Sequence, residues 1–123
     1  MIKLNVTVQG EPDTLPLRRN FKLEDQIDRE IFRNTLTVLR KKISSNSKLN
    51  VNECLYIFYD FVLRQLCMKK TAAEIEQTAI GFISDSQVFI GVPQTLAEIK
   101  IEIYVNHNMK ESVFIKGAIL KSY

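Results

Sequence analysis

The sequence predicts an α+β domain that is mostly helical, with about four helices and a small antiparallel β-sheet. Two patterns carry this prediction. Apolar residues recur at helical spacing through the middle of the chain, and capping signals precede several of these segments. Both ends of the chain alternate apolar and polar residues instead. The length, 123 residues, fits one domain with a single core.

The strands are predicted from period-two alternation. Residues 2–8 alternate in this way, and the prolines that follow are expected to break regular structure. The basic residues Arg18, Arg19 and Lys22 are expected to form a solvated face, and the alternative is that they meet an acidic partner. Residues 99–105 alternate again, a turn signal follows at 106–108, and a returning strand should contain Val113 and Ile115, with Gly117 as a candidate bulge.

The helix boundaries are predicted from capping residues. A first helix is expected over about 24–43, and a second, from a capping box at Asn50 and Glu53 to about residue 68, is expected to be the central core helix. Thr71 and Glu74 form another capping box, before a third helix over about 72–83. Asp85 is expected to cap a fourth, short helix that starts near residue 86 and resumes over 94–98.

A basic run, Arg40, Lys41 and Lys42, ends the first predicted helix. Cations at this end complement the helix dipole, as the acidic residues near the start also do. The alternative interpretation is a nucleic-acid patch, which no aromatic or glycine-rich RNA signature accompanies.

Composition indicates an ordinary globular protein. Hydrophobic residues make up 46% of the chain, and the net charge of +3 is too mild to demand a nucleic acid or a membrane. No apolar run approaches the roughly 20 residues of a membrane-spanning helix, and the first ten residues do not resemble a signal peptide. Cys54 and Cys67 point to different sides of one predicted helix, so they cannot pair within it. We expect two buried free thiols, which suit a reducing cytoplasm.

Residues suited to catalysis are sparse. His107 is the only histidine and falls in the predicted hairpin turn, whereas a nickel or zinc site needs several converging nitrogen or sulfur ligands. There is no nucleophile elbow, phosphate-binding loop or dinucleotide fingerprint. We therefore expect no catalytic, metal or cofactor site within this chain.

Aromatic residues cluster in the second predicted helix. Phe58 and Phe61 are expected in the core, whereas Tyr56 and Tyr59 are candidates for a protein interface, where tyrosine is enriched. Together with the basic run 40–42 and His107, they form the candidate interface set.

Several short motifs occur in a fixed order between about Leu23 and Ile119, nearly four-fifths of the chain. In order and spacing they resemble the gamma subunit of urease. The motifs are the basic run followed by Ile43, the Leu-Asn-x-x-Glu sequence at 49–53, the Thr-x-Ala-Glu-Leu-like sequence at 71–75, the Gln-Val-x-x-x-Val-Pro sequence at 87–93, and the Val-Glu-Ala-Thr-Phe-like sequence at 101–105.

The resemblance implies a partner rather than chemistry within this chain. Urease gamma subunits are α+β chains that pack with alpha and beta subunits in a trimer of heterotrimers, and the nickel ligands lie on alpha. By this resemblance the chain is a structural subunit of an assembly that hydrolyses urea to ammonia and carbamate. Residues 1–20 have no counterpart in the family, so they are expected to form an extension before a urease-gamma-like domain, 21–123.

Two alternatives remain open. The family's Pro-Asp-Gly-Thr hairpin is replaced here by residues 106–109, and its His-Glu-Pro-Ile ending by 116–119, which fits a gamma-like fold recruited as a scaffold in a different large assembly. In that case the N-terminal strand could pair with the C-terminal one or join a partner's sheet. The third hypothesis is a nucleic-acid-binding module that uses Arg18, Arg19, the basic run and Lys48.

Overall fold

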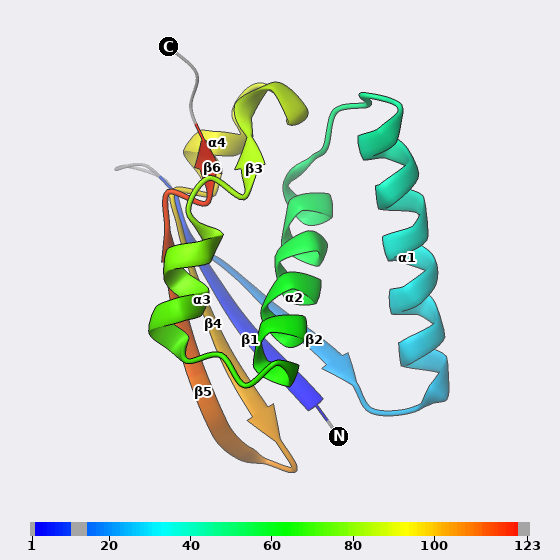
Figure 1. Ribbon diagram of the computed structural model, residues 1–123, viewed down its shortest axis with the longest axis vertical. Coiled ribbons are helices and arrows are strands. Elements are labelled where there is room, and N and C mark those ends of the chain that lie inside the picture. Colours follow the sequence, from blue (N-terminus) through cyan, green and yellow to red (C-terminus); the bar gives the residue numbers. More distant parts are fainter. Residues whose placement is uncertain (1, 11–14, 121–123) are drawn as a thin grey trace.

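In the computed structural model, which describes residues 2–10 and 15–120, helices cover one face of an antiparallel sheet (Figure 1). The fold class is therefore α+β, as the sequence predicts. The elements are β1 (Ile2–Gln9), β2 (Leu17–Leu23), α1 (Gln26–Ser44), α2 (Val51–Cys67), α3 (Ala72–Ala79), β3 (Ile83–Ser84), a 3₁₀ turn (Asp85–Gln87), α4 (Val92–Thr95), β4 (Glu98–Val105), β5 (Asn108–Lys116) and β6 (Ile119–Leu120).

The main sheet has four strands in the order β2-β1-β4-β5, and every neighbouring pair is antiparallel. Ile2 lies opposite Leu23 on one side and Val105 on the other. The inner face is apolar and buried, with Leu4, Val6 and Val8 on β1 beside the isoleucines of β4. The outer face carries polar side chains, as is usual for an antiparallel sheet with one solvated side.

The strand β2 was not predicted from the sequence. The segment containing Arg18, Arg19 and Lys22 is a paired edge strand, and these three basic side chains are exposed, as expected for a solvated face. Because β1 is paired on both sides, it is a central strand and has no free edge to offer to a partner. The expected boundary between residues 20 and 21 falls inside β2.

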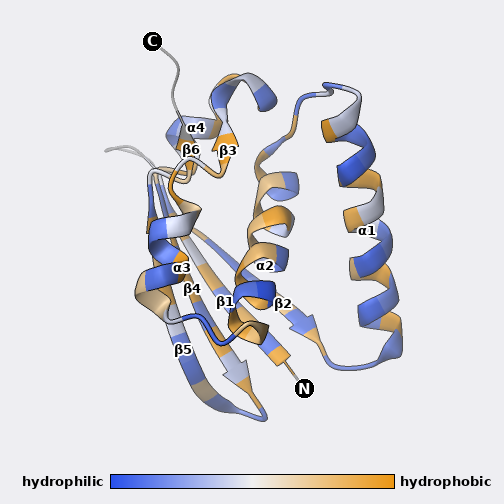
Figure 2. Cartoon of the chain, in the orientation of Figure 1, coloured by the Kyte–Doolittle hydropathy of each residue, from blue (hydrophilic) through white to orange (hydrophobic). Residues whose placement is uncertain are grey.

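The core lies between the sheet and α2, whose apolar side faces the inner strands (Figure 2). Phe58 and Val62 are completely buried, and Leu55 nearly so. Burying side chains of this size stabilises the fold by about 1.5–3 kcal/mol each. Thus α2 is the central core helix, as predicted.

The first three helices begin at capping residues. Asp25 accepts a hydrogen bond from the N–H of Asp28 at the start of α1. Both predicted capping boxes are present: Asn50 and Glu53 exchange hydrogen bonds of 2.9 Å in each direction, and Thr71 and Glu74 form the same motif at the start of α3.

The end of α3 and the segment after it differ from the prediction. The helix ends at Ala79 because the chain turns through Gly81, in the left-handed region, whose N–H donates to the Gly117 carbonyl at 2.9 Å. A parallel pairing of β3 with β6 follows. The N-cap of the 3₁₀ turn is Ser84, so Asp85 is the first residue of that turn rather than its cap. The last helix, α4, ends before the predicted 94–98 segment is complete.

The β4–β5 hairpin closes through Asn106 and His107, both with positive φ. This is the backbone twist of a primed two-residue turn, which matches the right-handed twist of the strands. The bulge in this hairpin occurs at the Ile103–Tyr104 step rather than at Gly117, which follows the end of β5.

Candidate functional site

The basic run at the end of α1 is divided between two ion-pair systems and solvent. Arg40 lies 3.9 Å from the Asp60 carboxylate, which also accepts a 3.0 Å hydrogen bond from Arg64. Lys42 lies 2.6 Å from Glu53, at the start of α2. Lys41 is exposed. The run therefore holds the end of α1 against α2 in addition to complementing the helix dipole.

A groove separates α1 from α2. It consists of two adjoining cavities, of about 290 and 480 Å³, that share Leu36, Arg40, Asp60 and Arg64. The first has apolar walls, and the second is rich in arginine. The groove was not predicted from the sequence, because it depends on how far α1 stands from α2. The residues that line only one cavity are Leu39, Ile43, Leu49, Ile57, Phe82, Ile83 and Gln87 in the first, and Leu23, Arg29, Phe32 and Arg33 in the second.

The two candidate interface tyrosines belong to an aromatic cluster beneath β2. The centroid of the Phe21 ring lies 4.8 Å from the ring centroid of Tyr59, 4.8 Å from that of Phe32 and 5.7 Å from that of Tyr56. Tyr59 is only 4% exposed, so it is a core residue and its assignment to an interface is wrong. Burial, and to a smaller extent the nearby Tyr56, raise the pKa of Tyr59 to about 12, which Arg19 partly opposes. Tyr56 is half-buried.

The cysteines differ in their surroundings. Cys54 is buried, and burial, with a smaller contribution from the Glu53 charge, raises the pKa of its thiol to about 12. Such a thiol is a poor nucleophile because almost none of it is thiolate near neutral pH. Cys67 is exposed, which corrects the expectation that both thiols are buried. It occupies the last turn of α2, beyond the core.

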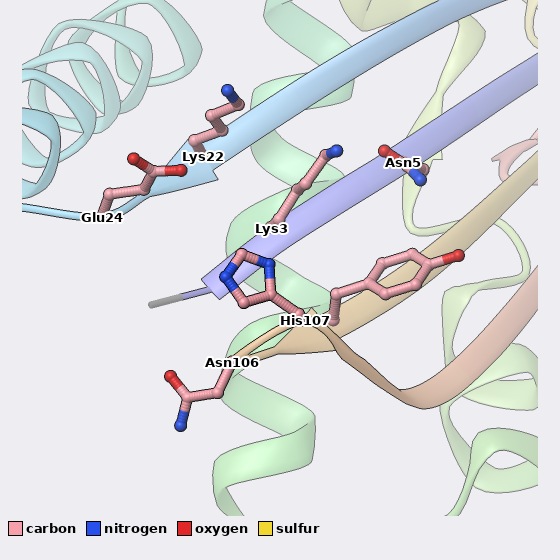
Figure 3. Close-up of a pocket in the computed structure, with 7 residues that line it drawn as sticks. Lys3, Asn5, Lys22, Glu24, Asn106 and His107 are labelled. Atoms are coloured by element: carbon pink, nitrogen blue, oxygen red, sulfur yellow. The ribbon is translucent and has the colours of Figure 1, made fainter.

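His107 is one of the residues that line a pocket of about 310 Å³ on the outer face of the sheet (Figure 3). Lys3 and Lys22 lie directly opposite each other on β1 and β2, next to Glu24 and Tyr104. In Figure 3 the side chain of Asn106 points away from the others. His107 itself is exposed in the turn, as predicted.

Apolar side chains remain exposed on several parts of the surface. Ile27, Ile31 and Val38 lie on the outer side of α1 and are 66, 56 and 57% exposed. Phe89 and Ile90, before α4, are also exposed. The loose apolar spacing of α1 was the sequence signal for this surface, because the helix presents one set of apolar residues inward and a second set outward.

The basic residues proposed for nucleic-acid binding do not form one patch. Arg18 and Arg19 are neighbours on β2 and so project to opposite faces of the sheet. Two members of the basic run are paired with carboxylates, and Lys48 donates to the Ser86 carbonyl at 2.6 Å. This distribution does not give the continuous basic surface that phosphate binding favours.

Within the described residues, no three histidine, cysteine or carboxylate side chains lie close enough together to hold a metal ion. None of the helices in that part of the chain combines the length and hydropathy needed to cross a bilayer. No protein-family model matches the chain.

Proposed function

We propose that this chain is a non-catalytic structural subunit of a urease-type hetero-oligomer. The nickel ions and the hydrolysis of urea belong to another subunit, and this chain contributes packing surface. The proposal rests on its resemblance to urease gamma, whose partners are the alpha and beta subunits.

The observation that carries the proposal is the position of the resembling motifs in the fold. The 49–53 and 71–75 motifs form the capping boxes of α2 and α3, and the 101–105 motif lies in β4, inside the sheet. The 87–93 motif contains Val88, which is buried and forms a β-bridge with Leu49. Each of these motifs thus has a structural role. This supports the interpretation that the motifs reflect a shared fold rather than a chance similarity of short peptides.

The exposed apolar residues give a second line of support. Three branched aliphatic residues on one side of α1 are more than half exposed. In an isolated chain the contact of this apolar surface with water is unfavourable. A surface of this kind is typical of a protein interface. In a hetero-oligomer a neighbouring subunit would cover it.

The β1–β2 hairpin favours a second candidate, a gamma-like fold that serves as scaffold in a different assembly. Most of β1 and β2 lies within residues 1–20, for which the resemblance to urease gamma gives no counterpart, and β2 is an edge strand of the main sheet. A partner strand could extend the sheet there by backbone hydrogen bonds.

Affinity purification of the tagged chain from its native source, with mass spectrometry and a urea-hydrolysis assay, tests the two candidates. The first predicts a large nickel-binding hydrolase chain and activity in the eluate. Unrelated partners without activity would favour the second. The double variant Ile27→Glu, Ile31→Glu should lose partners while it retains the fold, and Gln77→Glu, at an exposed position on α3, is the matched control.

A further inference from the structure

The groove between α1 and α2 has an unbalanced charge. Arg29, Arg33, Arg40 and Arg64 line it, and Asp60 is the only carboxylate among the described residues that do so. Asp60 is already shared by two of these arginines.

Arg29 and Arg33 differ from the other two arginines in their pairing. No ion pair within the described part of the chain joins Arg29 or Arg33 to a carboxylate. Three of the four arginines lie on α1 and Arg64 lies on α2. Four like charges around a cleft that has a single carboxylate create a field that attracts an anionic partner.

The groove also offers apolar surface beside these charges. Phe82 and Ile43, which line the more apolar cavity, are 45 and 38% exposed, and Ile57 is half-buried. By contrast, Leu36 and Leu39 are buried beneath them in the core. From residue 29 to residue 43, α1 is roughly 20 Å long at the usual helical rise. A ligand that fits must therefore be long, apolar on one side, and negatively charged at several points.

We propose that the α1–α2 groove binds an acidic amphipathic segment of a partner protein, with its apolar side chains on Ile43, Ile57 and Phe82 and its carboxylates on the arginines. The inference deepens the proposed role as a structural subunit, since it names the chemistry of one contact. The charge distribution favours this occupant over a fatty acid, because a fatty acid has one carboxylate and the arginines extend over three turns of α1. The charge distribution also favours a partner segment over a second copy of this chain, because the exposed residues of α1 include basic residues such as Lys41 as well as acidic ones such as Glu30.

Two synthetic peptides of about 15 residues test the groove on the purified full chain. Both place leucine at positions i, i+3 and i+7, and one carries glutamate where the other carries lysine. We expect the Leu/Glu peptide to bind, with amide chemical-shift changes at Leu36 and Ile57, and to bind more weakly as salt rises. We expect no binding of the Leu/Lys peptide.

Charge variants localise the effect. Arg33→Glu should weaken binding of the Leu/Glu peptide at least tenfold, because it replaces an attractive charge by a repulsive one. Asp60→Asn should strengthen binding, because it removes the competing carboxylate. The matched control is Arg18→Glu, on the outer face of the sheet, which should leave the affinity unchanged.

Several outcomes would overturn the inference. These are equal binding of the two peptides, binding of the Leu/Glu peptide that is insensitive to Arg33→Glu, and absence of binding at low salt. Laurate binding in the groove without peptide binding would assign it to a lipid, and sedimentation of a dimer through this face would assign it to a second copy. Because the assay uses no partner subunit, its failure would leave the result of the native purification unaffected.

Discussion

The carboxylate of Glu76, on α3, accepts a 2.8 Å hydrogen bond from the backbone N–H of Phe114, on β5. Since β5 is an edge strand of the main sheet, this N–H would otherwise be open to another chain. Glu76 thus occupies one hydrogen-bonding position of the edge and places a negative charge beside it. We expect this contact both to stabilise the fold and to limit edge-to-edge aggregation.

Glu76→Ala should therefore lower the free energy of unfolding by about 1.5–3 kcal/mol, the usual range for a hydrogen bond to a charged group. It should also raise the rate of aggregation. Denaturant unfolding and light scattering measure the two effects. Gln77→Ala, on the same helix but exposed, is the control, and an equal effect of both substitutions would exclude the edge contact as the cause.

Glu53 joins α1 to the start of α2, because its carboxylate accepts from the Asn50 N–H and pairs with Lys42. Glu53→Ala, which removes the N3 half of the capping box, should lower the free energy of unfolding by about 0.5–2 kcal/mol, the range for loss of a cap. A double-mutant cycle with Lys42→Ala should give a coupling energy of about 0.5–1 kcal/mol, since the pair is only partly buried. Purely additive effects would mean that the ion pair contributes nothing.

Lys69, just after α2, adopts a left-handed conformation with φ of 60°, and its N–H donates to the Leu66 carbonyl. Glycine is favoured at this position because it has no Cβ to clash. Lys69→Gly should therefore stabilise the protein by about 1 kcal/mol, seen as a higher midpoint in thermal or denaturant unfolding. Asn46→Gly, at the matching position after α1, should gain less, because asparagine tolerates this conformation. Destabilisation by Lys69→Gly would contradict the conformation described for Lys69.

Burial of Cys54 makes stability depend on alkaline pH. The folded state raises the pKa of this thiol from 9.0 to about 12, so the folded state holds its proton when the unfolded state has lost it. The free energy of unfolding should therefore fall as pH rises above 9, and Cys54 should account for about 2 kcal/mol of this loss by pH 10.5. Tyr59 acts in the same direction above about pH 10.

Denaturant unfolding between pH 7 and 10.5 measures this effect. Cys54→Ala should give a shallower decline than the parent chain, whatever its stability at pH 7. Cys67→Ala, which removes the exposed thiol, is the matched control. If the parent and Cys54→Ala declined in parallel, the thiol would not be the group that titrates.

The two thiols should also differ in reactivity. With a disulfide reagent such as dithionitrobenzoate at pH 8, Cys67 should react within seconds to minutes. Cys54 should react only at the rate at which the protein opens, because it is buried. Addition of denaturant should release the second thiol at once. Two fast equivalents in the native protein would contradict the burial of Cys54.

The parts of the fold that follow from local chemistry were predictable. The capping boxes at Asn50 and Thr71 depend on residues three positions apart, so the sequence alone places the starts of α2 and α3. The alternation in β4 likewise predicts which of its side chains are buried. The exposed position of His107 follows from the turn signal around it.

The parts of the fold that depend on contacts between residues far apart in the sequence were not predictable. The alternation of Leu17, Phe21 and Leu23 is obscured by the adjacent arginines, and β2 is recognisable only through its pairing with β1. Because Tyr59 is buried against Phe21, missing the strand also meant assigning the tyrosine to the surface. The end of α3 depends on the hydrogen bond between Gly81 and Gly117, and the groove depends on the spacing of α1 and α2. No local sequence pattern predicts either of these contacts.

The most direct test of the structural-subunit proposal is the native mass of the complex that contains this chain when it is isolated from its source. The proposal predicts an assembly far heavier than the 14.2 kDa chain, with nickel, a large hydrolase subunit, and this chain in a multiple of three copies. A particle with the mass of the single chain, or an assembly without nickel and a hydrolase subunit, would contradict it.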